Sequence, residues 1–147
     1  MKYIAIAGAT AVAVVAGATF MITRDGSRTQ AETATQPPAA GAAMVEVSLP
    51  DSLSAQAELG KRGFEAVCAA CHGQNAAGKL GLGPPLVHKI YEPSHHGDMA
   101  FFLAAERGVQ AHHWRFGNMP PQQGLTRADV ANIVSYVRAL QRANGID

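Results

Sequence analysis

The chain has 147 residues, two cysteines and six histidines, and its twelve Lys and Arg residues nearly balance eleven Asp and Glu residues. A formal net charge of +1 provides no basic field of the kind that holds nucleic acid. Two cysteines exclude a disulfide-dense scaffold and a four-cysteine metal cluster. The length fits one domain of ordinary size, and the uneven distribution of residue types divides the chain into three parts.

The first part, residues 1–23, is an apolar N-terminal segment. Sixteen of the twenty residues 3–22 are apolar, and Lys2 precedes them. A helix of this length, at about 1.5 Å per residue, just spans a hydrocarbon core of roughly 30 Å, which favours an uncleaved anchor. The alternatives are a signal peptide cleaved at Ala18, although residues 19–22 stay apolar, and, least favoured, a buried core helix. Both favoured interpretations place the rest of the chain outside the cytoplasm.

The second part, residues 24–50, has the composition of a linker. It is polar at first, then stiffened by two prolines at 37–38, and small and featureless after them. Val45, Val47 and Leu49 alternate with polar residues, which predicts a short extended stretch against the domain that follows.

The third part, residues 51–147, is expected to be an all-α globular domain with no convincing run of strands. The first helix should run from about residue 54 into the cysteine pair, with Leu59, Phe64 and Val67 among its apolar positions. Three helices in fewer than 100 residues make a small core, and a domain with such a core usually needs a covalent cross-link or a cofactor to be stable.

Two further helices carry recognisable end signals. The second is expected at residues 99–107, with Asp98 as its cap and Gly108 just past its end. The third begins at Thr126-x-x-Asp129, which resembles a capping box, and should close at residues 144–145. Its apolar residues recur at helical spacing: Val130, Ile133, Val134, Val137 and Leu140.

The first candidate functional motif is C-x-x-C-H at positions 68–72, which is the attachment signature of c-type haem. Two thiols three positions apart can reach the two vinyl groups of one porphyrin, and the adjacent histidine can then ligate the iron. The alternatives are a disulfide, a thioredoxin-like redox pair or half of a zinc site. No strand precedes Cys68 as a thioredoxin-like fold would require, and the other histidines are irregularly spaced for zinc.

Together with this motif, the chain resembles the class I cytochromes c over nearly all of residues 54–147. Gly60 and Phe64 stand eight and four positions before Cys68, like the first-helix glycine and aromatic of that family, and Ile133, Tyr136 and Val137 match its terminal-helix contacts. The resemblance implies the small class I cytochrome c fold. In this fold the N- and C-terminal helices cross near one covalently bound haem c, and the apolar segment and linker lie outside the domain.

The resemblance also implies the residues around the haem. Cys68 and Cys71 would form the thioethers, and His72 would ligate the iron. Gly83-Pro84-Pro85-Leu86 is similar to a family turn in which the carbonyl of Pro84 would accept the Nδ1–H of His72 and Leu86 would pack on the haem. Met119, in a Met-Pro loop before the last helix, would be the sixth ligand; otherwise a histidine or water would occupy that position.

The remaining histidines form two pairs, His95-His96 and His112-His113, with His88 alone. Adjacent histidines do not easily point at one site, so we expect them to face solvent or the haem propionates rather than to bind copper or zinc. Three more residues are candidate propionate donors: Tyr91, Trp114 and Arg115.

These features predict an electron carrier rather than an enzyme, because two protein ligands leave no open position on the iron. The resemblance implies a monomer that shuttles electrons between respiratory or photosynthetic membrane complexes, such as a quinol:cytochrome c oxidoreductase and a terminal oxidase. We expect it on the periplasmic side of a bacterial inner membrane, anchored by residues 3–22, or soluble in the periplasm after cleavage. The alternatives are a haem subunit of a larger oxidoreductase, a ligand-binding or peroxidatic haem protein if Met119 does not coordinate, and a metal-binding module built on the histidine pairs.

Overall fold

The computed structural model describes residues 37–147, and the predicted anchor at residues 3–22 lies outside them. The described part is helical, with no strand and only two isolated β-bridges. The elements are α1 (Ala55–Gly63), the π-helical turn η1 (Phe64–Cys68), α2 (Ala69–His72), the 3₁₀ turns η2 (Gln74–Ala76) and η3 (Lys89–Tyr91), α3 (Asp98–Arg107) and α4 (Arg127–Ala143). Within residues 37–147 no helix is both long enough and apolar enough to cross a membrane.

The predicted first helix is confirmed, and it continues through η1 and α2 into the cysteine motif. Ser54 begins it by accepting a hydrogen bond at Oγ from the Ala57 amide, 3.1 Å away. The π-helical turn is a departure that the sequence pattern did not predict, and such turns are common at functional sites. Leu59 was wrongly placed on the apolar face: its side chain is 50% exposed, whereas Phe64 is fully buried.

The second predicted helix, α3, is confirmed, but its cap differs from the prediction. Gly97 rather than Asp98 is the N-cap, and Asp98 is the first helical residue. The Asp98 carboxylate instead accepts a 2.8 Å hydrogen bond from Nε of Arg138 in α4, so a tertiary ion pair takes the side chain that capping would have used. Gly108 ends the helix at φ +75°, as expected for a glycine in this position.

The third predicted helix, α4, is confirmed together with its capping box. Oγ1 of Thr126 accepts from the Asp129 amide, and the Asp129 carboxylate accepts from the Thr126 amide. The buried face of α4 supplies much of the core, which is completed by residues from α1, η1 and the loop before η3. Its fully buried side chains include Phe64, Tyr136, Val137 and Leu140.

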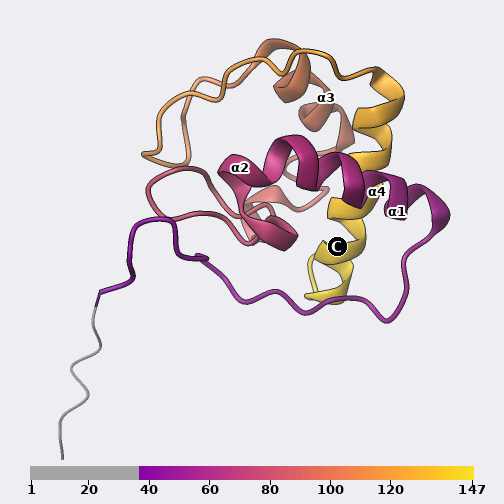
Figure 1. Ribbon diagram of the computed structural model, residues 1–147, viewed down its shortest axis with the longest axis horizontal. Coiled ribbons are helices and arrows are strands. Elements are labelled where there is room, and N and C mark those ends of the chain that lie inside the picture. Colours follow the sequence, from indigo (N-terminus) through magenta and orange to yellow (C-terminus); the bar gives the residue numbers. More distant parts are fainter. Residues whose placement is uncertain (1–36) are drawn as a thin grey trace, which may run out of the picture. The chain divides into compact units, whose positions relative to one another are not determined.

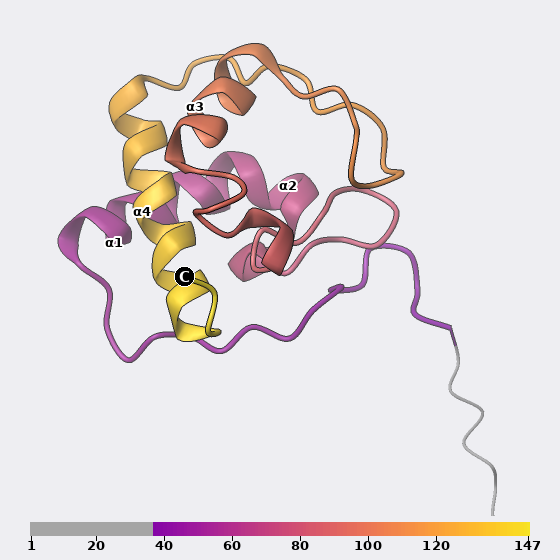
Figure 2. The same cartoon turned by 180° about the vertical axis from the view of Figure 1, so that it is seen from behind.

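Helix α4 crosses α1, and the two views in Figures 1 and 2 show the crossing from opposite sides. Gly60 lies at the contact, where a side chain would collide with the α4 backbone. Beside it the rings of Phe64 and Tyr136 meet edge to face, with centroids 5.7 Å apart. The glycine and the two aromatics therefore set how closely the helices approach.

The segment before α1 follows the surface of the domain, and Figure 1 shows it running below α1 and past the end of α4. Gly41 and Met44 donate backbone hydrogen bonds to the carbonyls of Leu80 and Ala77. Ser48 and Asn144 exchange two further hydrogen bonds of 2.9 Å. The extended stretch expected around Val47 thus packs against the domain.

Candidate functional site

A cavity of about 680 Å³ occupies the centre of the domain, between α2, α3, α4 and the two long loops. This volume lies within the roughly 300–1,000 Å³ of typical ligand pockets. Its walls are largely apolar, and the polar atoms are few. The cavity brings together the residues that the sequence singled out for the thioethers, the iron ligands and the turn beside them: Cys68, Cys71, His72, Pro84, Leu86 and Met119.

His72 is held by one hydrogen bond at the base of this cavity. Its Nδ1 donates to the Pro84 carbonyl oxygen at 2.8 Å, since a carbonyl can only accept. Burial lowers the pKa of His72, and this hydrogen bond only partly offsets the effect. The imidazole is therefore neutral at neutral pH and presents Nε2 as a free lone pair, the state that a metal ligand requires.

The two cysteines are free thiols at the same wall of the cavity. Burial, together with the neighbouring Cys71, raises the pKa of Cys68 to about 11. A thioredoxin-like pair needs a lowered thiol pKa, so Cys68 does not fit that alternative. Within residues 37–147, no third His, Asp or Glu joins the two thiols in a metal-binding group, which also disfavours half of a zinc site.

Met119 reaches the cavity from the loop between α3 and α4. Its backbone exchanges two 2.9 Å hydrogen bonds with Val109, which fix this otherwise irregular loop. The backbone at Gly108 lies directly against Met119, because a Cβ at position 108 would stand 2.4 Å from the Met119 carbonyl oxygen. The half-buried Met119 is therefore positioned by backbone contacts at the end of α3.

Trp114 brings a buried polar atom to the cavity wall. Its indole Nε1 is buried without a hydrogen bond, a costly arrangement unless a ligand supplies the acceptor. Tyr91 lines the same region. Burial raises the pKa of its hydroxyl, and the neighbouring Trp114 indole partly offsets that rise. Arg115, the third predicted donor, is exposed and does not line the cavity. An anionic group at this rim would satisfy Trp114.

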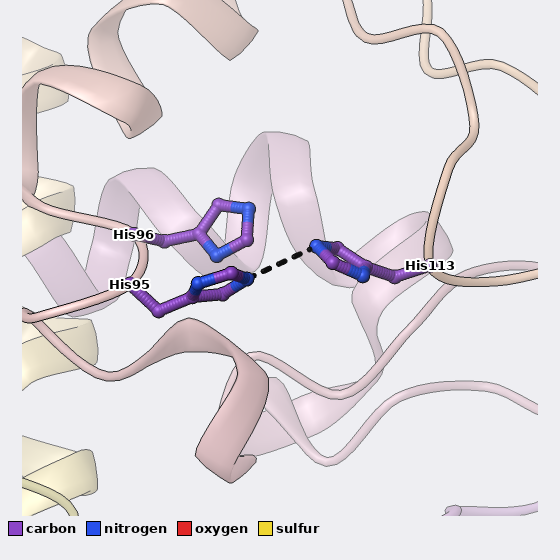
Figure 3. A group of neighbouring side chains, drawn as sticks. All are labelled: His95, His96 and His113. Atoms are coloured by element: carbon purple, nitrogen blue, oxygen red, sulfur yellow. Dashed lines mark hydrogen bonds between the residues drawn. The ribbon is translucent and has the colours of Figure 1, made fainter.

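The histidine pairs agree with the prediction only in part. One ring nitrogen from each of His95, His96 and His113 lies within 4.8 Å of the other two. Figure 3 shows the three rings as neighbours. The expectation that adjacent histidines do not point at one site is wrong for His95 and His96, whereas the expectation that the pairs face solvent holds for the exposed His95 and His113. The turn before α3 aims both His95 and His96 at the loop that carries His113, a contact between distant segments that sequence spacing does not reveal.

The comparison with known families agrees with this geometry. The family model described as Cytochrome c matches residues 57–141, more than half of the chain. The chain belongs to the cytochrome c family. A comparison with curated proteins finds no match.

For a cytochrome c domain, family membership implies one covalently bound haem c and a role in haem-based electron transfer. The residues present fit the haem. The cavity is apolar and of suitable size, and the thiols of Cys68 and Cys71 and the neutral imidazole of His72 border it. The buried indole N–H of Trp114 could donate a hydrogen bond to a haem propionate. The all-α fold agrees with the small class I fold expected from the sequence.

Proposed function

We propose that this cytochrome c is a single-haem, class I electron carrier in which Cys68 and Cys71 would hold the haem through thioethers and His72 and Met119 would ligate its iron. The observation that carries the proposal is that Met119, 47 positions after His72, borders the same cavity as Cys68, Cys71 and His72. The Pro84 carbonyl orients the His72 ring, and the loop anchored at Val109 presents the Met119 thioether.

Haem supplies reversible one-electron chemistry at iron when it is bound, and the chain sets the conditions for it. Two fixed protein ligands leave no position for a substrate, which favours electron transfer over catalysis. Ligation by the Met119 thioether together with His72 would raise the reduction potential relative to ligation by two histidines. The buried side chains Phe64 and Leu86 exclude water from the cavity and so favour the less charged reduced state.

The partners are proposed to be membrane-bound redox complexes, with a quinol:cytochrome c oxidoreductase as donor and a terminal oxidase as acceptor. In residues 51–147, nine Lys and Arg residues face eight Asp and Glu residues, so charge steering toward a partner should be weak. If residues 3–22 anchor the chain on the periplasmic side of the membrane, the linker keeps the haem domain close to the membrane. The effective concentration of the haem domain at these complexes then rises without charge steering.

A visible spectrum of the purified protein in both redox states tests the haem and its ligation together. We expect a covalently bound, six-coordinate haem that does not bind carbon monoxide when reduced at neutral pH. Rapid carbon monoxide binding would contradict ligation by Met119 and favour the ligand-binding or peroxidatic alternative. Copurification of the haem chain in a fixed ratio with catalytic subunits would instead favour a subunit of a larger oxidoreductase.

The membrane anchor has its own test. The mass of the mature protein distinguishes an uncleaved chain, whose residues 3–22 remain, from a chain cleaved at Ala18. Retention of the apolar segment with recovery in the membrane fraction supports the anchor. A mature chain that begins near residue 19 and is released with the periplasmic fraction would contradict it.

A further inference from the structure

The histidine cluster of His95, His96 and His113 lies on two loops at the rim of the domain. The first two residues come from the turn between η3 and α3, and the third from the loop between α3 and α4 (Figure 3). His95 and His113 are exposed and His96 is half-buried, and both His96 and His113 also line the central cavity. None of the three is needed as a ligand in the proposed function.

Two nitrogens of the histidine cluster lie within hydrogen-bonding distance of each other. Nε2 of His95 and Nε2 of His113 are 3.3 Å apart, so one ring donates a hydrogen bond to the other in the metal-free protein. Two imidazole nitrogens bound at 2.0–2.1 Å to one tetrahedral cation are separated by about 3.3–3.4 Å, whereas adjacent ligands of a square-planar cation are separated by about 2.8–3.0 Å. The observed distance therefore matches one edge of a tetrahedral site.

A hydrogen bond at Nδ1 of His96 leaves Nε2 of the same ring available to bind a cation. Nδ1 of His96 donates to the Ile90 carbonyl oxygen at 2.7 Å. Because the proton is on Nδ1, the neutral ring has its lone pair on Nε2. A hydrogen bond from the other ring nitrogen to a carbonyl is the usual outer contact of a metal-bound histidine. It fixes both the tautomer and the orientation of the ring.

We propose that His95, His96 and His113 form a binding site for one closed-shell cation that prefers tetrahedral imidazole ligation, Zn²⁺ or Cu⁺. The fourth position is left to water or to His112, whose ring centroid lies 4.3 Å from that of His113. Nδ1 of His112 also donates to a backbone carbonyl, that of Gln110, at 2.8 Å. This arrangement leaves Nε2 of His112 free to bind as well.

The test uses the full-length, haem-loaded protein and a competition titration against a chromophoric chelator, once with Zn²⁺ and once with Cu⁺. We expect one tightly bound cation per chain. His95→Ala and His113→Ala should each weaken binding by about 100-fold or more, since the loss of even an outer partner of a metal ligand costs about 10–100-fold. An unchanged visible spectrum shows that these exposed positions have not disturbed the fold or the haem.

The matched control is His88→Asn, which removes the one histidine outside both the histidine pairs and the haem motif. His88 caps η3 by accepting from the Ile90 amide at Nδ1, and asparagine can retain that function. This variant should bind the cation with wild-type affinity. Zinc-edge X-ray absorption should show nitrogen ligands at about 2.0–2.1 Å in the loaded protein.

Three outcomes would overturn the proposal. The wild-type protein could bind neither cation stoichiometrically, or the two alanine variants could bind as tightly as wild type. In the third, His95→Ala and His113→Ala change only the pH dependence of the haem potential and leave cation binding intact. That result would assign these side chains to the haem propionates instead.

Discussion

Gly60 in α1 lies directly against the backbone of Asn132 in α4. A Cβ atom at position 60 would stand 1.8 Å from the Asn132 carbonyl oxygen, and the obstacle is rigid backbone rather than a movable side chain. The closest approach of the two helices is therefore fixed by the absence of a single methyl group.

Gly60→Ala should destabilise the protein by about 3 kcal/mol or more, at or beyond the upper end of ordinary overpacking, because the helices must separate. Guanidinium unfolding of the haem-loaded protein measures the loss. Gly63→Ala is the matched control in the same helix, since its Cβ would meet only the Ile133 side chain at 3.3 Å. The control should be close to neutral, because alanine also gains about 1 kcal/mol of helix propensity. Equal effects of the two variants would contradict this account of the crossing.

Met119→Ala should open the sixth position of the haem iron and lower the reduction potential, because the thioether is lost. Redox titration measures the potential, and carbon monoxide binding to the reduced protein reports the open position. Met99→Ala removes a methionine that is 56% exposed at the start of α3 and should change neither property. A Met119→Ala protein with the wild-type spectrum and potential would refute the ligand assignment.

The capping box of α4 should give the protein a measurable acid sensitivity. Hydrogen bonds from the hydroxyl and amide of Thr126 lower the pKa of Asp129 below its ordinary value. A carboxyl with a lowered folded-state pKa contributes stability that is complete above its unfolded value, about 3.9, and is lost as the pH falls through its folded value. The stability advantage of wild type over Asp129→Asn should therefore be constant at neutral pH and shrink below about pH 4.

The other half of the capping box can be tested without changing a charge. Thr126→Ala should cost about 1 kcal/mol, because the amides at the start of α4 lose their acceptor. Thr126→Ser retains the hydroxyl and should cost much less. Both values come from denaturant unfolding at neutral pH, and equal losses in the two variants would show that the hydroxyl is not the source of the stability.

Cation binding at the histidine cluster should raise the haem reduction potential. His96 and His113 also line the cavity, so a bound cation adds positive charge at its rim and favours the less positive, reduced state. Redox titration with and without Zn²⁺ measures the shift, which should be absent in His113→Ala. By linkage, the reduced protein should bind the cation more tightly than the oxidised protein. Equal affinities in the two redox states would contradict the coupling.

The sequence by itself determined the local features of the domain. The start of the first helix near residue 54, the capping box at Thr126, the terminating Gly108 and the helical spacing of α4 depend on contacts within a few residues, so pattern and position suffice to predict them. The C-x-x-C-H spacing is equally local, and it led to the family to which the chain belongs.

The tertiary structure decided what depends on contacts between distant segments. Arg138 takes Asp98 away from its predicted capping role, and Gln141 donates from α4 to the carbonyls of Leu86 and Tyr91 to hold the loop beside the cavity. The same long-range packing brings His113 to His95 across 17 intervening residues. Sequence spacing carries no signal for such meetings, because the direction of each side chain is set by the turn that holds it. For that reason the haem motif was evident in the sequence, whereas the histidine cluster emerged only from the fold.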